Sequence, residues 1–313
     1  MKIVVLEPLG IPAERVREIL RGAAGAETEV VCYPDRVTEP EALGARCAGA
    51  EIAVLANLPF PRAAIERCDS LKLLCVAFTG VDHVDVDCCR ERGVAVCNCA
   101  GYATTAVAEL TFGLLFSLLR RLPAVEERCR DGGVRDGLIG RELEGKTFGV
   151  VGSGAIGSRV CALAGAFGCR VLACNRSGRP VSGAESVTLE ELLRESDIVS
   201  LHTPLTPETR GMIGREQLAM MKPGALLLNT ARGDVVDSAA LREALESGHL
   251  AGAGVDVFHA EPPLGEEPLL GAPNCVFTPH IGFATHEACE KRAALVGGNI
   301  AAFLRGEERC RIC

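Results

Sequence analysis

The sequence predicts an α/β protein made of two doubly wound parallel-sheet domains. Short runs rich in Val, Ile and Leu recur along the chain and alternate with helix-like segments, which is the pattern of parallel sheets. The chain of 313 residues is also longer than one ordinary core, because single cores tend to divide beyond about 250–300 residues. A hydrophobic content of 48% with 24% charged residues is typical of a packed globular protein.

The first series of strands predicts the smaller sheet. Its β-rich runs cover residues 3–6, 29–33, 52–55, 73–78 and 94–97, with helix-like or Gly/Pro-bearing segments between them. A helix is predicted over residues 104–119. Residues 128–145 are charged and rich in glycine, so we expect them to form an excursion on the surface.

The second series of strands predicts the larger sheet. Its strands are expected at residues 147–151, 170–174, 198–201, 225–228, 254–257 and 276–278. In doubly wound sheets, ligands bind beyond the carboxyl ends of the strands. We therefore expect the chemistry of the protein at that edge.

Charge and hydropathy exclude several classes of partner. The chain carries 33 Lys and Arg against 41 Asp and Glu, a net charge of −8, and lacks a basic stripe suited to nucleic acid. The longest apolar stretch, residues 110–119, is about half of the ~20 residues that span a bilayer, so no membrane association is expected. The N-terminal residues do not resemble a secretory signal, and we expect a cytoplasmic protein.

The cysteines are interpreted as small buried hydrophobic residues. There are 16, and most lie inside apolar runs, as Cys75 and Cys97 do. The single Cys-x-x-Cys pattern, Cys310 to Cys313, lacks a second pair of ligands for tetrahedral zinc. We expect no metal site.

A glycine-rich loop predicts dinucleotide binding. It follows an apolar strand, opens a helix-like segment and reads Gly152-Ser153-Gly154-Ala155-Ile156-Gly157. Such glycines allow a tight turn, the close approach of a pyrophosphate and close packing of helix on strand, while the helix N-terminus supplies amides. Gly152, Gly154, Ala155, Ile156 and Gly157 are the expected cofactor contacts.

The end of the next strand bears on the choice of nicotinamide dinucleotide. A carboxylate there would bind the ribose hydroxyls and repel a 2′-phosphate, but the sequence reads Asn175-Arg176-Ser177. A guanidinium and a hydroxyl suit a phosphate, so NADP(H) is favoured. If Arg176 is only a solvated loop residue, NAD(H) or use of both cofactors stays open.

The sequence closely resembles the D-isomer-specific 2-hydroxyacid dehydrogenase family over essentially its whole length. Besides the glycine loop, the matching stretches are residues 202–209 (HTPLTPET), 228–233 (LNTARG), 254–258 (GVDVF) with Glu261-Pro262, and 278–282 (TPHIG). The resemblance implies a Rossmann cofactor domain and a smaller, flavodoxin-like substrate domain. It also implies a reductase of the glyoxylate and hydroxypyruvate type.

The residues of an acid-base set are present. Reduction of a 2-oxo acid requires an acid for the carbonyl oxygen, a cation for the carboxylate and a cofactor that delivers hydride. His280 can be the acid, because imidazole titrates near working pH. Arg232 offers a planar fork to the carboxylate and carbonyl oxygen. The resemblance implies that Glu261 is the carboxylate partner of His280.

The resemblance also implies further cofactor contacts. These are His202, Thr203, Pro204 and Thr209 in a turn after the strand at 198–201, Thr230 and Ala231 beside Arg232, Thr104, and Asp256 near the nicotinamide carboxamide. The alternative for Asp256 is a hydrogen-bonded aspartate at a strand end.

For the substrate, the resemblance points to the loop Ala77-Phe78-Thr79-Gly80, whose backbone amides hold the carboxylate in this family. Phe78 fits either an apolar wall beside the substrate or core packing. Val76 stands where phosphoglycerate-type members tend to carry an arginine, which disfavours a phosphorylated substrate. Formate-oxidising members replace the glutamate with an amide, so Glu261 disfavours formate.

Two segments resemble the interdomain crossings of the family. They are residues 102–109 and 283–287, and they imply a discontinuous substrate domain, 1–98 with 286–313, and a dinucleotide-binding domain at 99–285. The two crossings would act as a hinge. The segment after the first crossing usually builds a dimer in relatives, so a homodimer is expected.

The leading hypothesis is therefore an NADPH-preferring reductase of glyoxylate, hydroxypyruvate or a similar unphosphorylated 2-oxo acid. A D-lactate-like or aromatic 2-oxo acid dehydrogenase is the enzymatic alternative. The non-enzymatic alternative is a corepressor-like binding protein that senses dinucleotides.

Overall fold

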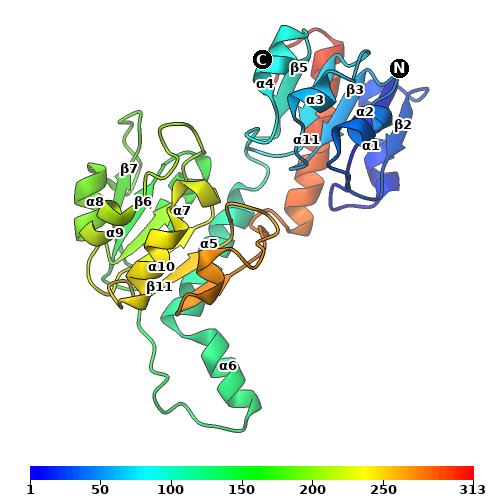
Figure 1. The fold of residues 1–313 in the computed structure, drawn as a ribbon. Coiled ribbons are helices and arrows are strands. Elements are labelled where there is room, and N and C mark those ends of the chain that lie inside the picture. Colours follow the sequence, from blue (N-terminus) through cyan, green and yellow to red (C-terminus); the bar gives the residue numbers. More distant parts are fainter. The chain divides into compact units, whose positions relative to one another are not determined.

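The computed structural model describes residues 1–313, and the chain divides into two compact α/β units (Figure 1). Unit 1 is formed by Met1–Ala103 with Phe283–Cys313, and unit 2 by Thr104–Gly282. The predicted class, two doubly wound parallel-sheet domains, is confirmed by sheets of five and seven strands. The sequence predicts the first boundary after residue 98, and the structure changes unit five residues later.

Unit 1 contains a five-stranded sheet in the order β2-β1-β3-β4-β5, with every pair parallel. This order is the flavodoxin-like one. The strands are β1 (Lys2–Val5), β2 (Glu29–Cys32), β3 (Ile52–Leu55), β4 (Leu73–Val76) and β5 (Ala95–Asn98). All residues of β3 and β4 are buried, as expected for central strands covered on both faces.

The helices of unit 1 cover that sheet. They are α1 (Ala13–Ala24), α2 (Pro40–Arg46), α3 (Arg62–Ile65), α4 (Val86–Glu91) and α11 (His286–Leu304). Helices α1 and α11 pack side by side, although they lie at opposite ends of the chain. Val16 and Leu20 form the buried stripe of α1, while Thr285 caps α11 by accepting a hydrogen bond from the amide of Ala288.

Unit 2 contains a parallel seven-stranded sheet in the order β12-β11-β10-β9-β6-β7-β8. The strands are β6 (Thr147–Val151), β7 (Arg170–Cys174), β8 (Glu185–Ser186), β9 (Ile198–Leu201), β10 (Leu226–Asn229), β11 (Gly252–Val255) and β12 (Cys275–Phe277). This is the Rossmann order, in which the direction of winding reverses between β6 and β9. The sequence does not predict β8, because its two residues are exposed and carry no apolar pattern.

Alternation along β6 shows how this sheet is covered on both faces. Phe148 and Val150 belong to one core with helices α5 (Thr104–Leu119) and α7 (Ala155–Ala166). Val151 belongs to the other core, with helices α8 (Leu189–Glu195), α9 (Arg215–Met220) and α10 (Ser238–Glu246). Because side chains alternate along a strand, one sheet contributes to two cores.

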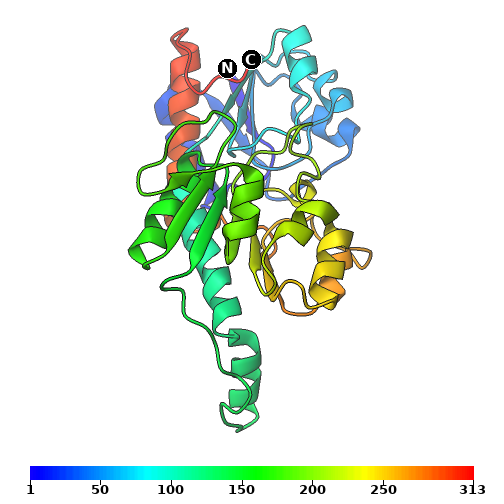
Figure 2. The same ribbon diagram turned by 90° about the vertical axis from the view of Figure 1, so that its left-hand side faces the viewer.

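Helix α6 (Leu122–Arg130) and the loop that follows extend away from the rest of unit 2 (Figure 2). No residue of α6 is buried, and Val134 and Ile139 in the loop are 66% and 85% exposed. The excursion predicted at residues 128–145 therefore begins earlier than expected, with a helix. No helix in either unit is both long and apolar enough to cross a bilayer.

Candidate active site

The glycine loop lies between β6 and α7 and depends on two close approaches. Gly152 has φ of 90°, and a Cβ there would stand 2.6 Å from the carbonyl oxygen of His202. A Cβ on Gly157 would overlap the carbonyl oxygen of Gly152. A Cβ on Gly154 would meet nothing within 4 Å. The first and third glycines are thus required by packing, and the space above the second is open.

This loop meets the requirements for a dinucleotide. Gly154 is the N-cap residue of α7 and offers no side chain to the first amides of the helix. Those amides and the positive end of the helix dipole lie at the open space beside Gly154. Such a site suits a pyrophosphate. The loop also lies at the topological switch point, because β6 and β9 are neighbours there.

The turn after β9 forms the other side of the switch point. His202 follows the strand, and its Nε2 lies 2.8 Å from the hydroxyl oxygen of Ser200. Burial lowers the pKa of His202 to about 3, so its ring is neutral near pH 7. The hydroxyl of Thr209 donates to the carbonyl of Pro204 at 2.7 Å and holds the turn together. With its pKa lowered in this way, His202 is a less suitable proton donor than a histidine that titrates near pH 7.

The loop after β7 presents cations and no carboxylate. The amide nitrogen of Asn175 donates to the hydroxyl oxygen of Ser153 at 2.6 Å and to the carbonyl of Arg179 at 2.9 Å. The side chain of Asn175 therefore connects this loop to the glycine loop. Arg176, Ser177 and Arg179 are exposed. Arg179 was not identified from the sequence, and it adds a second guanidinium to the same turn.

Arg232, Glu261 and His280 follow three strands that are neighbours in the sheet, namely β10, β11 and β12. Their loops emerge at the same carboxyl edge, so residues separated by up to 48 positions are brought to one region. A Cβ on Gly233 would overlap the carbonyl group of Phe258, which shows how closely the loops after β10 and β11 approach each other.

Asn229, the last residue of β10, braces the arginine loop. Its amide nitrogen donates to the carbonyl of Arg232 at 2.9 Å, and its amide oxygen accepts from the backbone of Ala231 at 3.1 Å. The hydroxyl oxygens of Thr230 and Thr111 lie 3.1 Å apart, which ties the loop to α5. The sequence pattern identified Arg232 but gave no sign of the role of Asn229.

His280 and Glu261, the predicted acid-base residues, form a side-chain pair. Nδ1 of His280 lies 2.5 Å from Oε2 of Glu261, and the side chains are 17% and 29% exposed. We assign the Nδ1 hydrogen to the imidazole, because an ionised carboxylate can only accept. The predicted proton donor would then be the other ring nitrogen, Nε2.

His280 has φ of 53°, a left-handed conformation that is uncommon for a residue with a side chain. Asp256 holds this turn in place. One of its oxygens accepts from the hydroxyl of Thr278 and the amide of Ile281, and the other accepts from the amide of Gly282. Burial raises the pKa of Asp256, against the opposing effect of these hydrogen bonds. Asp256 is thus a hydrogen-bonded aspartate at a strand end, and its contact with the nicotinamide carboxamide stays a prediction.

The predicted substrate loop belongs to unit 1 and follows β4. The amide of Ala77 donates to the carbonyl of Leu55 at 2.6 Å, while Thr79 is exposed. Phe78 is 5% exposed, and its ring centroid lies 5.0 Å from that of Phe283 and 6.1 Å from that of Tyr102. Of the two interpretations of Phe78, this cluster favours core packing.

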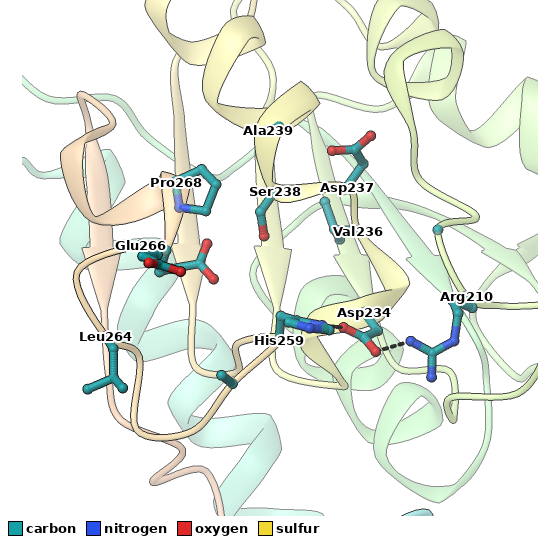
Figure 3. Close-up of a pocket in the computed structure, with 13 residues that line it drawn as sticks. Arg210, Asp234, Val236, Asp237, Ser238, Ala239, His259, Leu264, Glu266 and Pro268 are labelled. Atoms are coloured by element: carbon teal, nitrogen blue, oxygen red, sulfur yellow. Dashed lines mark hydrogen bonds and ion pairs between the residues drawn. The ribbon is translucent and has the colours of Figure 1, made fainter.

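A pocket of about 870 Å³ opens beside the same loops of unit 2 (Figure 3). Its walls include Arg210, Asp234 and His259. Neither Arg232 nor Glu261 nor His280 is among the residues that line it.

The fold and the site define a nicotinamide-dependent oxidoreductase, with a glycine loop at the switch point of a Rossmann sheet and a histidine-carboxylate pair at the same edge. The sequence profile of the D-isomer specific 2-hydroxyacid dehydrogenase NAD binding domain matches residues 112–282. The chain belongs to this family, whose members are dehydrogenases acting on the CH–OH group of 2-hydroxy acids.

Individual relatives agree with this assignment. The chain is 43% identical over 255 residues to the glyoxylate reductase of Thermococcus litoralis, over 78% of this chain and 77% of that one. It is 35% identical to the hydroxypyruvate reductase of Blautia hydrogenotrophica, over 86% and 87% of the two chains. A solved structure of an acyclic imino acid reductase with NADPH and D-Arg is similar over the whole of both chains, with a TM-score of 0.92 and 31% identity.

Proposed function

We propose that the protein is an NADPH-preferring reductase of a small unphosphorylated 2-oxo acid, with glyoxylate or hydroxypyruvate as the best substrates. The observation that carries the proposal is the pairing of His280 with Glu261 on loops adjacent to that of Arg232. This set supplies a proton donor, its carboxylate partner and a cation for the substrate carboxylate.

In the reaction we propose, the bound nicotinamide supplies hydride to the carbonyl carbon. Arg232 binds the carboxylate and polarises the carbonyl group. The proton on Nε2 of His280 passes to the carbonyl oxygen, and the negative charge of Glu261 stabilises the imidazolium before that transfer. The 2-oxo acid, NADPH and one proton thus give the D-2-hydroxy acid and NADP⁺. The backbone amides of residues 77–80 are the proposed further contacts of the substrate carboxylate.

The preference for a small, unphosphorylated acid rests on Val76 and on the named relatives, while Glu261 disfavours formate. The apolar Val76 offers no charge to a phosphate. Similar proteins named glyoxylate reductase and hydroxypyruvate reductase support the choice of acid.

The preference for NADPH rests on the loop after β7. Arg176 and Arg179 place two guanidinium groups on one turn, and no carboxylate occupies residues 175–179 to repel a 2′-phosphate. Asn175 ties this turn to the glycine loop, which supports a role of the turn in dinucleotide binding.

The test is a comparison of kcat/KM for glyoxylate, hydroxypyruvate, pyruvate and phenylpyruvate, each with NADPH and with NADH. We expect clear turnover of the first two acids and a preference for NADPH. Higher values for pyruvate or phenylpyruvate would replace the proposal with the D-lactate-like or aromatic alternative. Dinucleotide binding without turnover of any acid would indicate the corepressor-like alternative.

We also propose that the protein is a homodimer formed through α6 and the loop after it. The exposed apolar side chains of this segment, Leu122, Val125, Val134 and Ile139, are the surface that a partner copy would cover. Light scattering after gel filtration should give twice the chain mass of 32.9 kDa. Val134→Asp with Ile139→Asp should give the single-chain mass. A single-chain mass for the unaltered protein would refute the dimer.

A further inference from the structure

The loop that carries Arg232 is joined to the loop that carries Glu261, and to the turn after β9, through Asp234, a residue to which no role has been assigned. Asp234 lies in the short 3-10 helix η1 (Gly233–Val235), two positions after Arg232. Its side chain is only 16% exposed. One carboxylate oxygen is paired with Nδ1 of His259 and the other with Nη1 of Arg210 (Figure 3).

The pair with His259 connects the arginine loop to the glutamate loop. His259 precedes Glu261 by two residues on the loop after β11. The amide of Phe258 in that loop donates to Oε1 of Glu261 at 3.3 Å, so the segment that carries His259 also orients the carboxylate. Since the loops are in contact at Gly233, the Asp234–His259 pair lies beside the point where they meet.

The pair with Arg210 connects the arginine loop to the turn after β9. Arg210 directly follows Thr209, which closes that turn. Backbone hydrogen bonds continue the connection, because the amide of Gly211 donates to the carbonyl of Asp234 at 2.7 Å and the amide of Ile213 donates to that of Val235 at 3.1 Å. Asp234 is thus bound to both neighbouring loops by its side chain and to one of them by its backbone.

We propose that Asp234 is a positioning residue, which holds the Glu261 loop and the turn at 203–209 in register with Arg232 through its pairs with His259 and Arg210. The inference rests on the proposed function, because it assigns Asp234 to the same acid-base set. It does not touch the reacting atoms, and acts through Glu261 and through the dinucleotide-side turn.

The residues around Asp234 explain why its carboxylate, and not side-chain packing, positions these loops. The pocket opens beside the pair, so there is no packed core on that side of Asp234 to hold the loops. His259 and Arg210 are 75% and 59% exposed. Exposed ion pairs add little to the stability of a fold, but they can restrict the geometry of a loop. We therefore expect an effect on turnover without an effect on folding.

The experiment compares Asp234→Asn, His259→Gln and Arg210→Gln with Glu243→Gln as the matched control. Glu243 is paired with Arg215 between α9 and α10 in the same unit, away from these loops. Asp234→Asn and His259→Gln should each lower kcat by about fivefold or more, because misplacement of a catalytic group by less than 1 Å already costs rate. Thermal unfolding of both variants should match that of the control.

The Asp234–His259 and Asp234–Arg210 connections are distinguished by measuring kcat and the dinucleotide Kd. His259→Gln should leave the dinucleotide Kd unchanged, whereas Arg210→Gln should weaken dinucleotide binding and leave kcat at saturation near that of the unaltered protein. Asp234→Asn should both lower kcat and weaken dinucleotide binding. The double variant Asp234→Asn/His259→Gln should be no slower than Asp234→Asn, since both changes break the same pair. Values of kcat equal to that of Glu243→Gln, or additive losses in the double variant, would overturn the proposal.

Failure of the proposed function would be seen separately. If the unaltered protein reduces none of the acids, hydrogen exchange of residues 257–262 gives the answer for Asp234. Faster exchange in Asp234→Asn than in Glu243→Gln would support the positioning role, and equal exchange would refute it.

Discussion

Nδ1 of His280 lies 2.5 Å from Oε2 of Glu261, although 19 residues separate them along the chain. The two side chains meet because β11 and β12 are paired, and each residue stands on the loop that leaves one of these strands. Asp256 holds the turn that contains His280 through three hydrogen bonds. The imidazole is therefore oriented from both sides before any ligand binds.

Removal of the imidazole should abolish most of the turnover. For His280→Ala we expect kcat to fall by about 10³-fold, within the range known for general acids, because no other group in the loop can donate the proton. His202 is a poor substitute, since its depressed pKa of about 3 keeps its imidazolium from forming near pH 7. Fluorescence titration should show an unchanged dinucleotide Kd. The exposed His286 provides the control, and unchanged turnover in His280→Ala would refute the assignment.

The positions of the three proposed catalytic residues could be predicted from the sequence because each follows a recognisable strand. The carboxyl ends of parallel strands lie at one edge, so the motifs alone implied that Arg232, Glu261 and His280 converge. The shift of β11, expected at 254–257 and found at Gly252–Val255, did not affect this inference. The residues still lie beyond the strand end.

The supporting residues could not be predicted in the same way. Asp234 is paired with residues 24 and 25 positions away, and no local pattern marks such contacts. Asn229 was visible only as part of a motif, and its two hydrogen bonds depend on the path of the loop. Gly233 shows why: its role is set by the backbone of Phe258, which approaches from another strand.

The choice of dinucleotide should depend on Arg176. Arg176→Ala should weaken NADPH binding by about tenfold, the value of a charge-assisted hydrogen bond, and leave NADH binding nearly unchanged. The Arg179→Ala variant measures the second guanidinium of the turn, and Arg194→Ala on the exposed face of α8 is the control. Kd values for both dinucleotides give the answer. An equal loss of affinity for NADPH and NADH would show that Arg176 does not bind the 2′-phosphate.

The glycine loop offers a comparison between two positions of the same motif. Gly154→Ala should fold normally, because the new Cβ meets no protein atom within 4 Å, but it should weaken dinucleotide binding by occupying the open space beside this residue. Gly157→Ala should lower the unfolding temperature by several degrees, because its Cβ overlaps the carbonyl of Gly152. Thermal unfolding and dinucleotide titration of both variants test this contrast. Full binding by Gly154→Ala would argue against a phosphate beside that residue.

His202 should make the stability of the protein depend on pH. Its pKa is about 3 in the folded protein and near 6.5 when unfolded, so only the unfolded chain takes up this proton between those values. The contribution is fully present above about pH 6.5 and is lost as the pH falls toward 3. At pH 5 the loss should reach at most about 2 kcal/mol.

His202→Gln removes this titration, so the variant should lose less stability than the unaltered protein between pH 7.5 and pH 5. Other groups titrate in both proteins, and the difference between the two unfolding curves isolates His202. His286→Gln, at an exposed position, should behave like the unaltered protein. If His202→Gln and the unaltered protein lose equal stability on acidification, then the pKa of His202 does not differ between the folded and unfolded states, and the ring is protonated in the folded protein at pH 5. It would then be a second candidate proton donor beside the dinucleotide, and the assignment of that role to His280 alone would have to be revised.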